Sequence, residues 1–260
     1  MNIGIIGHGF VGSAVAAAHK HDQLTIVDPK LSNSATFEDL DQCDAIYICV
    51  PSPLGEDRSC NTAILENVLH ELKKSPHFFL KVIISKVTAP PSAYLKLQEK
   101  YPNLVHSPEF LTAKNAINDY ANSKLTVIGG YDIWATTALS VIKQGKSADA
   151  EIITDIVTAA LYKYLANSFL ATKVTFMNEF YELARAYGVE WESLSTIASF
   201  DDRLGKGHLS VPGPDGKYGW GGMCFPKDIA AICTDASIKN VQFDLIRQVE
   251  KLNQRHRRKQ

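Results

Sequence analysis

Three absences narrow the class of protein to which this sequence of 260 residues belongs. It has no run of about 18 or more apolar residues, so no ordinary membrane-spanning helix is expected. It has no excess of charge, because 27 basic residues stand against 28 acidic ones, so no overall field would attract nucleic acid or an anionic membrane. Its five cysteines show no C-x-x-C spacing. We therefore expect a reducing compartment, no disulfide framework and no bound metal.

The N-terminus also lacks the features of a secretory signal. The chain begins on an apolar run at residues 3–6, with no basic segment or cleavage site. The one basic cluster, at residues 255–259, is more typical of a solvated or frayed helix end than of a nucleic-acid-binding arm. With 45% apolar and 21% charged residues, the composition is that of a globular protein. We expect a cytoplasmic protein that binds neither membranes nor nucleic acid.

Short apolar runs alternate with helix-length stretches up to about residue 130. Two such stretches are residues 12–19 and 63–73. Alternating strands and helices predict βαβ units and a doubly wound parallel sheet of the Rossmann type. The expected strands are residues 2–6, 24–27, 45–50, 81–85, 104–105 and 125–128.

The second half of the chain has apolar residues at helical spacing. A loop rich in glycine and proline interrupts this pattern, and Gly188 is a suitable C-cap for the longest predicted helix. The expected helices are residues 132–143, 150–187 and 228 to the C-terminus, with the loop at 204–226. The sequence therefore predicts a Rossmann-type domain at residues 1–130 and an all-helical domain at residues 131–260.

The strongest local signal is the sequence G-x-G-x-x-G at residues 7–12, between a predicted strand and a predicted helix. The first glycine permits a tight turn, the second a close approach to a pyrophosphate, and the third close packing of helix and strand. The helix N-terminus then faces the phosphates. Asp28 ends the next strand, where a carboxylate accepts a hydrogen bond from a ribose 2′-hydroxyl and repels a 2′-phosphate, which favours NAD over NADP. The expected cofactor-binding residues here are Gly7, Gly9, Phe10, Val11, Gly12 and Asp28.

Further segments resemble those of the UDP-glucose/GDP-mannose dehydrogenase family. The most specific is G-G-M-C-F-P-K-D at residues 221–228, close to the family's G-G-S-C-F-P-K-D. The others follow the family's order along nearly the whole chain. They are V-P-S-P at 50–53, K-V-T-A-P at 86–90, S-P-E-F-L at 107–111, K-Y-L-A-N-S-F-L-A-T-K at 163–173 and D-R-L-G at 202–205.

This resemblance implies an NAD-dependent oxidoreductase that converts the C6 alcohol of a nucleotide sugar to a carboxylate in two hydride transfers. UDP-glucose, giving UDP-glucuronate, is the favoured substrate. Cys224 fits the nucleophile that holds the aldehyde, because Pro226 would start a helix there and a thiolate is favoured at a helix N-terminus beside Lys227. Cys224 would carry the sugar first as a thiohemiacetal and then as a thioester.

Five other residues are implied as catalytic. Lys163 and Asn167 lie on one face of a helical pattern, where an ammonium and an amide can stabilise an oxyanion. Asp228 resembles a member of the family's acid–base set. Thr88 and Glu109 are expected at strand ends, where ligands gather in doubly wound sheets, and would hold the water that hydrolyses the thioester, with Glu109 as the base.

The resemblance also implies binding residues. Pro51, Ser52 and Thr88 are expected near the cofactor. Arg203 resembles an arginine that reaches the substrate of a neighbouring subunit, and the long apolar helix at 150–187 predicts a homodimer. The expected substrate-binding residues are Glu109, Phe110, Leu111, Lys163, Asn167, Arg203, His208, Leu209 and Gly221.

The sequence departs from the family's pattern in three places. Ala113 stands where the family has a second glutamate, and residues 212–217 are an insertion in the glycine-rich loop. No counterpart of the family's C-terminal nucleotide-binding domain is found. The sequence alone leaves open weak substrate binding, a site completed by the dimer partner, and a domain supplied by a separate nucleotide-binding chain.

Two other functions fit part of the pattern. A β-hydroxyacid dehydrogenase related to 6-phosphogluconate dehydrogenase shares the glycine fingerprint and a helical second domain, but needs no cysteine at position 224. A truncated protein that only binds NAD would explain the missing domain, but not the retained set of catalytic residues.

Overall fold

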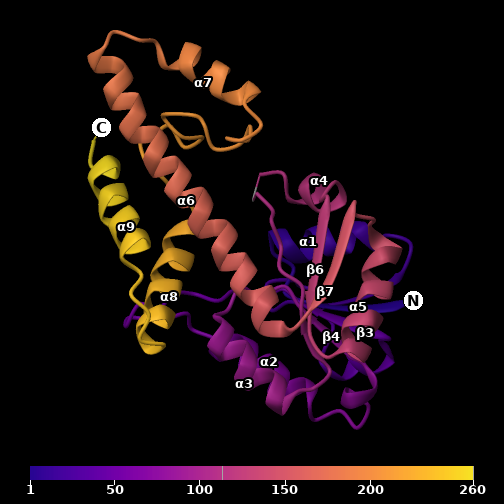
Figure 1. Ribbon diagram of the computed structural model, residues 1–260. Coiled ribbons are helices and arrows are strands. Elements are labelled where there is room, and N and C mark those ends of the chain that lie inside the picture. Colours follow the sequence, from indigo (N-terminus) through magenta and orange to yellow (C-terminus); the bar gives the residue numbers. More distant parts are fainter. Residues whose placement is uncertain (113, 260) are drawn as a thin grey trace. The chain divides into compact units, whose positions relative to one another are not determined.

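The computed structural model of the protein describes residues 1–112 and 114–259 and divides into two compact units (Figure 1). Unit 1 comprises residues 1–53 and 60–163, and unit 2 comprises residues 54–59 and 164–260. This division falls later in the chain than the change of pattern near residue 130. Ala113, the position of the family's second glutamate, lies outside the described residues.

Unit 1 contains a seven-stranded sheet with the strand order β2-β1-β3-β4-β5-β6-β7. All neighbouring strands pair in parallel except β5 and β6, which are antiparallel. The strands are β1 (Asn2–Ile6), β2 (Gln23–Val27), β3 (Ala45–Ile48), β4 (Val82–Ser85), β5 (Leu104–His106), β6 (Leu125–Gly129) and β7 (Ala150–Thr154). The six predicted strands and the Rossmann-type sheet are therefore confirmed.

Helices cover both faces of this sheet. Alternate strand residues supply the two cores, with Ala45 and Tyr47 facing one and Ile46 and Ile48 the other. The first core is closed by α1 (Phe10–Ala18), α4 (Ala116–Ala121) and α5 (Asp132–Gly145). The second is closed by α2 (Ala63–Leu72), α3 (Pro91–Lys100), the short helices η1 (Glu38–Gln42) and η2 (Phe78–Leu80), and the start of α6 (Ile156–Ala186).

The prediction of a helix over residues 150–187 is wrong for residues 150–154 and correct for residues 156–186. Residues Ala150–Thr154 form β7, which pairs with β6 along its whole length. Asp155 ends this strand and begins the helix, because its carboxylate accepts hydrogen bonds from the Thr158 amide at 2.8 Å and hydroxyl at 2.6 Å. At the other end Gly188 adopts a φ of 71°, as expected of a C-cap.

Unit 2 is helical, and three of its helices pack around Trp220. They are α6, α8 (Phe225–Ile238) and α9 (Asp244–Arg257), while α7 (Trp191–Phe200) contacts a smaller core that contains Leu209. The sequence predicted a single helix from residue 228 onwards. The structure has two, because Asn240 turns the chain with a φ of 56° and the Val241 amide donates back to the Ala236 carbonyl at 2.8 Å.

The basic cluster at residues 255–259 is the end of α9 and is paired with acidic side chains of unit 2. Arg255 contacts Glu179 at 3.0 Å, and both His256 and Lys259 contact Glu182. These contacts link the end of α9 to α6. Among the described residues, no helix is long and apolar enough to cross a membrane.

Candidate active site

The glycine-rich turn of unit 1 leads from β1 into α1. Gly7 has a φ of 89°, and a Cβ atom on Gly12 would lie 2.0 Å from the Gly7 carbonyl oxygen, so turn and helix touch through backbone alone. Gly9 differs, because nothing lies within 4 Å of a Cβ placed there. It is also the N-cap of α1 and gives that helix no side-chain cap. Open space in front of an uncapped helix N-terminus fits a pyrophosphate group.

Asp28 follows β2 and bonds to the same turn. Its carboxylate accepts hydrogen bonds from the His8 amide at 2.6 Å and the Lys30 amide at 2.9 Å. These two bonds, the one from His8 first, hold the pKa of Asp28 below its ordinary value. The carboxylate is thus ionised and placed beside the turn, as a group that accepts from a ribose hydroxyl must be.

The expected cofactor-binding residues after β3 and β4 also come together. The Ser52 hydroxyl donates to the Thr88 carbonyl oxygen at 2.6 Å, and both side chains are buried. Pro51, which precedes Ser52, is exposed. The two loops meet where their parallel strands end, which is the edge at which ligands gather in such sheets.

Glu109 and Lys163 form a buried ion pair, with Nζ and Oε1 3.0 Å apart. Lys163 also donates to the Glu109 carbonyl oxygen, and the Leu111 amide donates to the other carboxylate oxygen at 2.8 Å. The ring of Phe110 lies 5.3 Å from the Lys163 ammonium. Each charge is therefore compensated, which a buried pair requires. This brings Lys163 together with the segment at residues 109–111, although Glu109 and Lys163 are 54 positions apart in the sequence.

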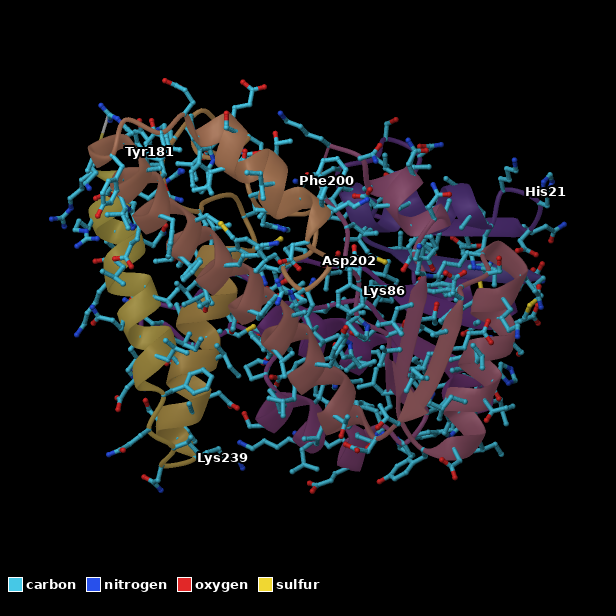
Figure 2. All side chains as sticks on the ribbon, turned by 45° about the horizontal axis from the view of Figure 1, so that its top comes forward. His21, Lys86, Tyr181, Phe200, Asp202 and Lys239 are labelled. Carbon is cyan, nitrogen blue, oxygen red and sulfur yellow. The ribbon has the colours of Figure 1, made fainter. Side chains whose placement is uncertain are left out.

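A second buried lysine lies near this pair. Lys86 of the K-V-T-A-P segment, labelled in Figure 2, donates to the Ser107 hydroxyl at 2.9 Å. Burial, and after it the charge of Lys146, lowers the pKa of Lys86 to about 7. The ammonium groups of Lys86 and Lys146 lie over the ring of Tyr120, 5.3 Å and 4.7 Å from its centroid. Lys86 thus supports the segment that carries Glu109, a role that the sequence did not reveal.

In unit 2, Cys224 occupies the N-cap position of α8, and Pro226 lies in the first turn, as expected. Asp228 follows in that turn and is almost fully buried. Its carboxylate accepts from the Asn167 amide at 2.6 Å and from Lys227 Nζ at 2.6 Å. The structure therefore joins Asn167 of α6 to the helix that begins at the cysteine.

The loop before α8 carries the expected substrate-binding residues Arg203, His208 and Leu209. Lys173 of α6 holds its start by donating to the carbonyl oxygens of Leu204 at 2.8 Å and Gly205 at 2.9 Å, and also to that of Gly207. Arg203 itself is exposed and pairs with Asp201 through two hydrogen bonds. Lys173 stands in a motif that resembles the family's, but only the structure shows what its ammonium binds.

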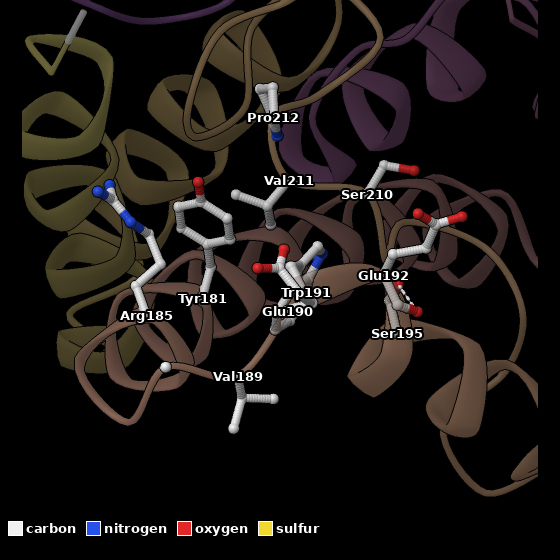
Figure 3. A pocket seen from close by; sticks show the side chains of 11 residues that line it. Tyr181, Arg185, Val189, Glu190, Trp191, Glu192, Ser195, Ser210, Val211 and Pro212 are labelled. Carbon is white, nitrogen blue, oxygen red and sulfur yellow. Dashed lines mark hydrogen bonds between the residues drawn. The ribbon is translucent and has the colours of Figure 1, made fainter.

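The same loop continues past a hollow of about 530 Å³ at the end of α6 (Figure 3). Tyr181 and Arg185 line one side and Val211 another. Leu209 is buried next to it, and its carbonyl oxygen accepts from the Trp191 indole at 3.2 Å. The loop is therefore fixed at Leu209 as well as at Lys173. Within the described residues, no group of three or more metal-ligating side chains gathers at this or any other place.

Together these features define a protein with a dinucleotide-binding Rossmann-type unit followed by a helical unit. The chain matches the profile of the UDP-glucose/GDP-mannose dehydrogenase family NAD-binding domain over residues 28–144, and that of the family's central domain over residues 157–255. The chain belongs to this family, whose NAD-binding domain it contains.

Known relatives agree with this assignment. YtcA of Bacillus subtilis (strain 168) is 30% identical over 97% of this chain and 67% of its own length. UDP-glucose 6-dehydrogenase of Rickettsia felis is 33% identical over 83% of this chain and 48% of its own length. A UDP-glucose dehydrogenase structure from Pyrobaculum islandicum has the same fold, with a TM-score of 0.84 at 22% identity, over 98% of this chain and 68% of that one. The chain thus spans about half to two thirds of the length of these relatives.

Proposed function

We propose that this protein oxidises the C6 alcohol of a nucleotide sugar to the uronate in two steps, with UDP-glucose as the favoured substrate. The observation that carries this proposal is the first turn of α8. There Cys224 stands at the N-cap and Asp228, four residues later, is bonded by Asn167 and Lys227. A nucleophile beside a buried, oriented carboxylate fits covalent catalysis on an aldehyde.

The reaction divides into an oxidation, an addition, a second oxidation and a hydrolysis. NAD, when bound, accepts the hydride in each oxidation. The alcohol first loses a proton and a hydride to become an aldehyde, with Asp228 and a water taking up the proton. The Cys224 sulfur then adds to the aldehyde carbon and forms a thiohemiacetal. Loss of a second hydride from carbon and of the hydroxyl proton, which Asp228 and the water again take up, turns this adduct into a thioester.

Hydrolysis releases the acid. Water attacks the thioester carbon, the C–S bond breaks, and the Cys224 thiol is restored. We assign activation of this water to Glu109 with the help of Thr88, and stabilisation of the oxyanions to Lys163 and Asn167. Within unit 1, the ion pair with Lys163 and the hydrogen bond from the Leu111 amide hold the Glu109 carboxylate in one position, as a base that must reach its water requires.

The remaining expected residues would bind the nucleotide sugar. We assign Phe110 and Leu111 to the sugar side, and Arg203, His208, Leu209 and Gly221 to the loop that meets the nucleotide. His208 is held against the Phe225 ring, with ring centroids 5.9 Å apart, and burial lowers its pKa. It is therefore neutral near pH 7, where an imidazole can hydrogen-bond a base or hydroxyl in either direction.

We further propose that the protein is a homodimer in the cytoplasm. Within unit 2, α6 exposes large apolar side chains three, four or seven residues apart, a spacing that places them along one face of the helix. These side chains are Leu165, Phe169, Phe176, Phe180 and Leu183. A second copy of the chain would cover them.

The test is the amount of NADH released per sugar from a panel of UDP- and GDP-sugars. We expect two NADH per UDP-glucose, and no uronate from Cys224→Ala. Cys233→Ala is the matched control, since Cys233 is a buried residue of the same helix with no proposed role. One NADH per sugar, or full turnover by Cys224→Ala, would contradict the cysteine mechanism. Saturable NAD binding with no NADH from any sugar would contradict the proposed activity.

A further inference from the structure

The loop that leads to Cys224 is held by an amide side chain from α9. Asn253 Nδ2 donates to the Trp220 carbonyl oxygen at 2.9 Å, and Asn253 Oδ1 accepts from the Trp220 amide at 2.7 Å. The Asn253 side chain thus pairs with both the N–H and the C=O of Trp220, as the backbone of a neighbouring β-strand would. Asn253 and Trp220 are only 6% and 5% exposed, so water does not replace these bonds if they are lost.

A second asparagine holds the preceding residue. Asn178 of α6 is 2% exposed, and its Oδ1 accepts from the Gly219 amide at 2.9 Å. The Trp220 indole donates to the Thr175 hydroxyl of the same helix at 2.9 Å. The backbone at 219–220 is therefore fixed from two helices at once, four residues before Cys224.

Two glycines of this loop lie directly against side chains of α9. A Cβ on Gly219 would lie 2.3 Å from Asn253 Oδ1, and a Cβ on Gly221 would lie 2.6 Å from an Arg257 guanidinium nitrogen. Arg257 also pairs with Asp215 of the inserted segment at 2.7 Å. Gly219 is required because its φ of 71° and the Asn253 side chain leave no place for a Cβ atom, whereas at Gly221 the end of the Arg257 side chain could move aside.

We propose that Asn253 is a positioning residue for Cys224. It acts through the loop backbone, because fixing Trp220 fixes the course of the short segment that enters α8 at the cysteine. This inference rests on the proposed role of Cys224 as the nucleophile. A displacement of about 1 Å can lower the rate of a covalent step about a hundredfold, so a clamp on this segment acts on turnover.

The test compares Asn253→Leu, which keeps the volume but removes both hydrogen bonds, with Asn253→Asp, which keeps only the acceptor. Gln254→Ala, at the next and exposed position of α9, is the control. We expect kcat for UDP-glucose oxidation to fall about thirtyfold or more in Asn253→Leu and less in Asn253→Asp. The KM for NAD is expected to stay within about twofold in all variants, because the cofactor residues belong to unit 1.

Hydrogen exchange separates this role from a general loss of structure. We expect faster exchange in peptides that contain residues 218–224 of Asn253→Leu, with the strands of unit 1 unchanged. Faster exchange with a normal kcat would overturn the proposal, since the clamp would then be structural only. A normal kcat with unchanged exchange would overturn it as well. An inactive wild-type protein would instead contradict the proposed function, whatever the exchange shows.

Discussion

The two units build their sites in different ways. In unit 1 the proposed cofactor residues lie at strand ends and in one tight turn, within which Gly7 and Gly12 approach so closely that a Cβ atom would not fit between them. In unit 2 the proposed substrate residues Arg203, His208 and Leu209 lie on an irregular loop that leads to Cys224. Distant side chains hold this loop in place, chiefly Lys173, Asn178 and Asn253. A site of the first kind depends on small residues, and one of the second kind depends on polar side chains that hold the loop from neighbouring helices.

The largest effect is expected at the glycine turn. Gly12→Ala would force a Cβ to within 2.0 Å of the Gly7 carbonyl oxygen, so we expect loss of NAD binding and destabilisation by about 3 kcal/mol or more. Gly9→Ala has open space around it, so we expect it to weaken NAD binding more than tenfold while the free energy of unfolding changes by about 1 kcal/mol or less. Calorimetric binding and urea denaturation measure both. Equal stability of the two variants would contradict the account of the turn.

The next largest effect is expected at Lys173, whose side chain holds the loop of unit 2. Lys173→Met removes the ammonium that holds the carbonyl groups of Leu204, Gly205 and Gly207, so the start of the loop loses its link to α6. We expect the affinity for UDP-glucose to fall about tenfold, with NAD affinity unchanged. The exposed Lys206→Met, in the same loop, is the control. Equal losses of both affinities would show that Lys173 supports the fold and not the loop.

Lys86 gives a pH test of the buried cluster in unit 1. Its pKa is about 7 in the folded protein and ordinarily 10.5, so the unfolded chain binds the extra proton between these values. The burial of Lys86 therefore costs no stability above pH 10.5. As the pH drops from 10.5 to about 7, it lowers the free energy of unfolding by at most about 1.4 kcal/mol per pH unit. Lys86→Met should remove this slope. We expect the variant to gain stability over the wild type at pH 7 and to lose that gain by pH 10, as measured by denaturation at each pH.

The smallest effect is expected at the end of α9. Arg255 pairs with Glu179, and both side chains are about half exposed. Such pairs are screened by solvent, so Arg255→Ala should change the free energy of unfolding by less than about 1 kcal/mol. A larger loss at high salt would show that Arg255 acts through packing instead.

The sequence could predict the turn and strand ends of unit 1 better than the side chains that hold the loop of unit 2. The six strands, the glycine turn with Asp28, and the start of α8 at Cys224 could be predicted because each is marked within a short segment, by an apolar run, by spaced glycines, or by the proline after the cysteine. β7 was missed because adjacent isoleucines on an edge strand also fit helical spacing. The roles of Asn178 and Asn253 depend on hydrogen bonds to a loop that is distant in the sequence. The sequence shows only that each amide follows a core valine by four residues, Val174 and Val249 respectively, and so lies on an apolar helix face.

The central claim is that Cys224 carries the sugar as a thioester, and its most direct test is to trap that adduct. Glu109→Gln should slow hydrolysis while leaving both oxidations, so incubation with NAD and UDP-glucose should add the mass of the oxidised nucleotide sugar to the peptide that contains Cys224. The account predicts this adduct by mass spectrometry, and its absence in Cys224→Ala. Release of NADH with no adduct on any cysteine of Glu109→Gln would contradict the account.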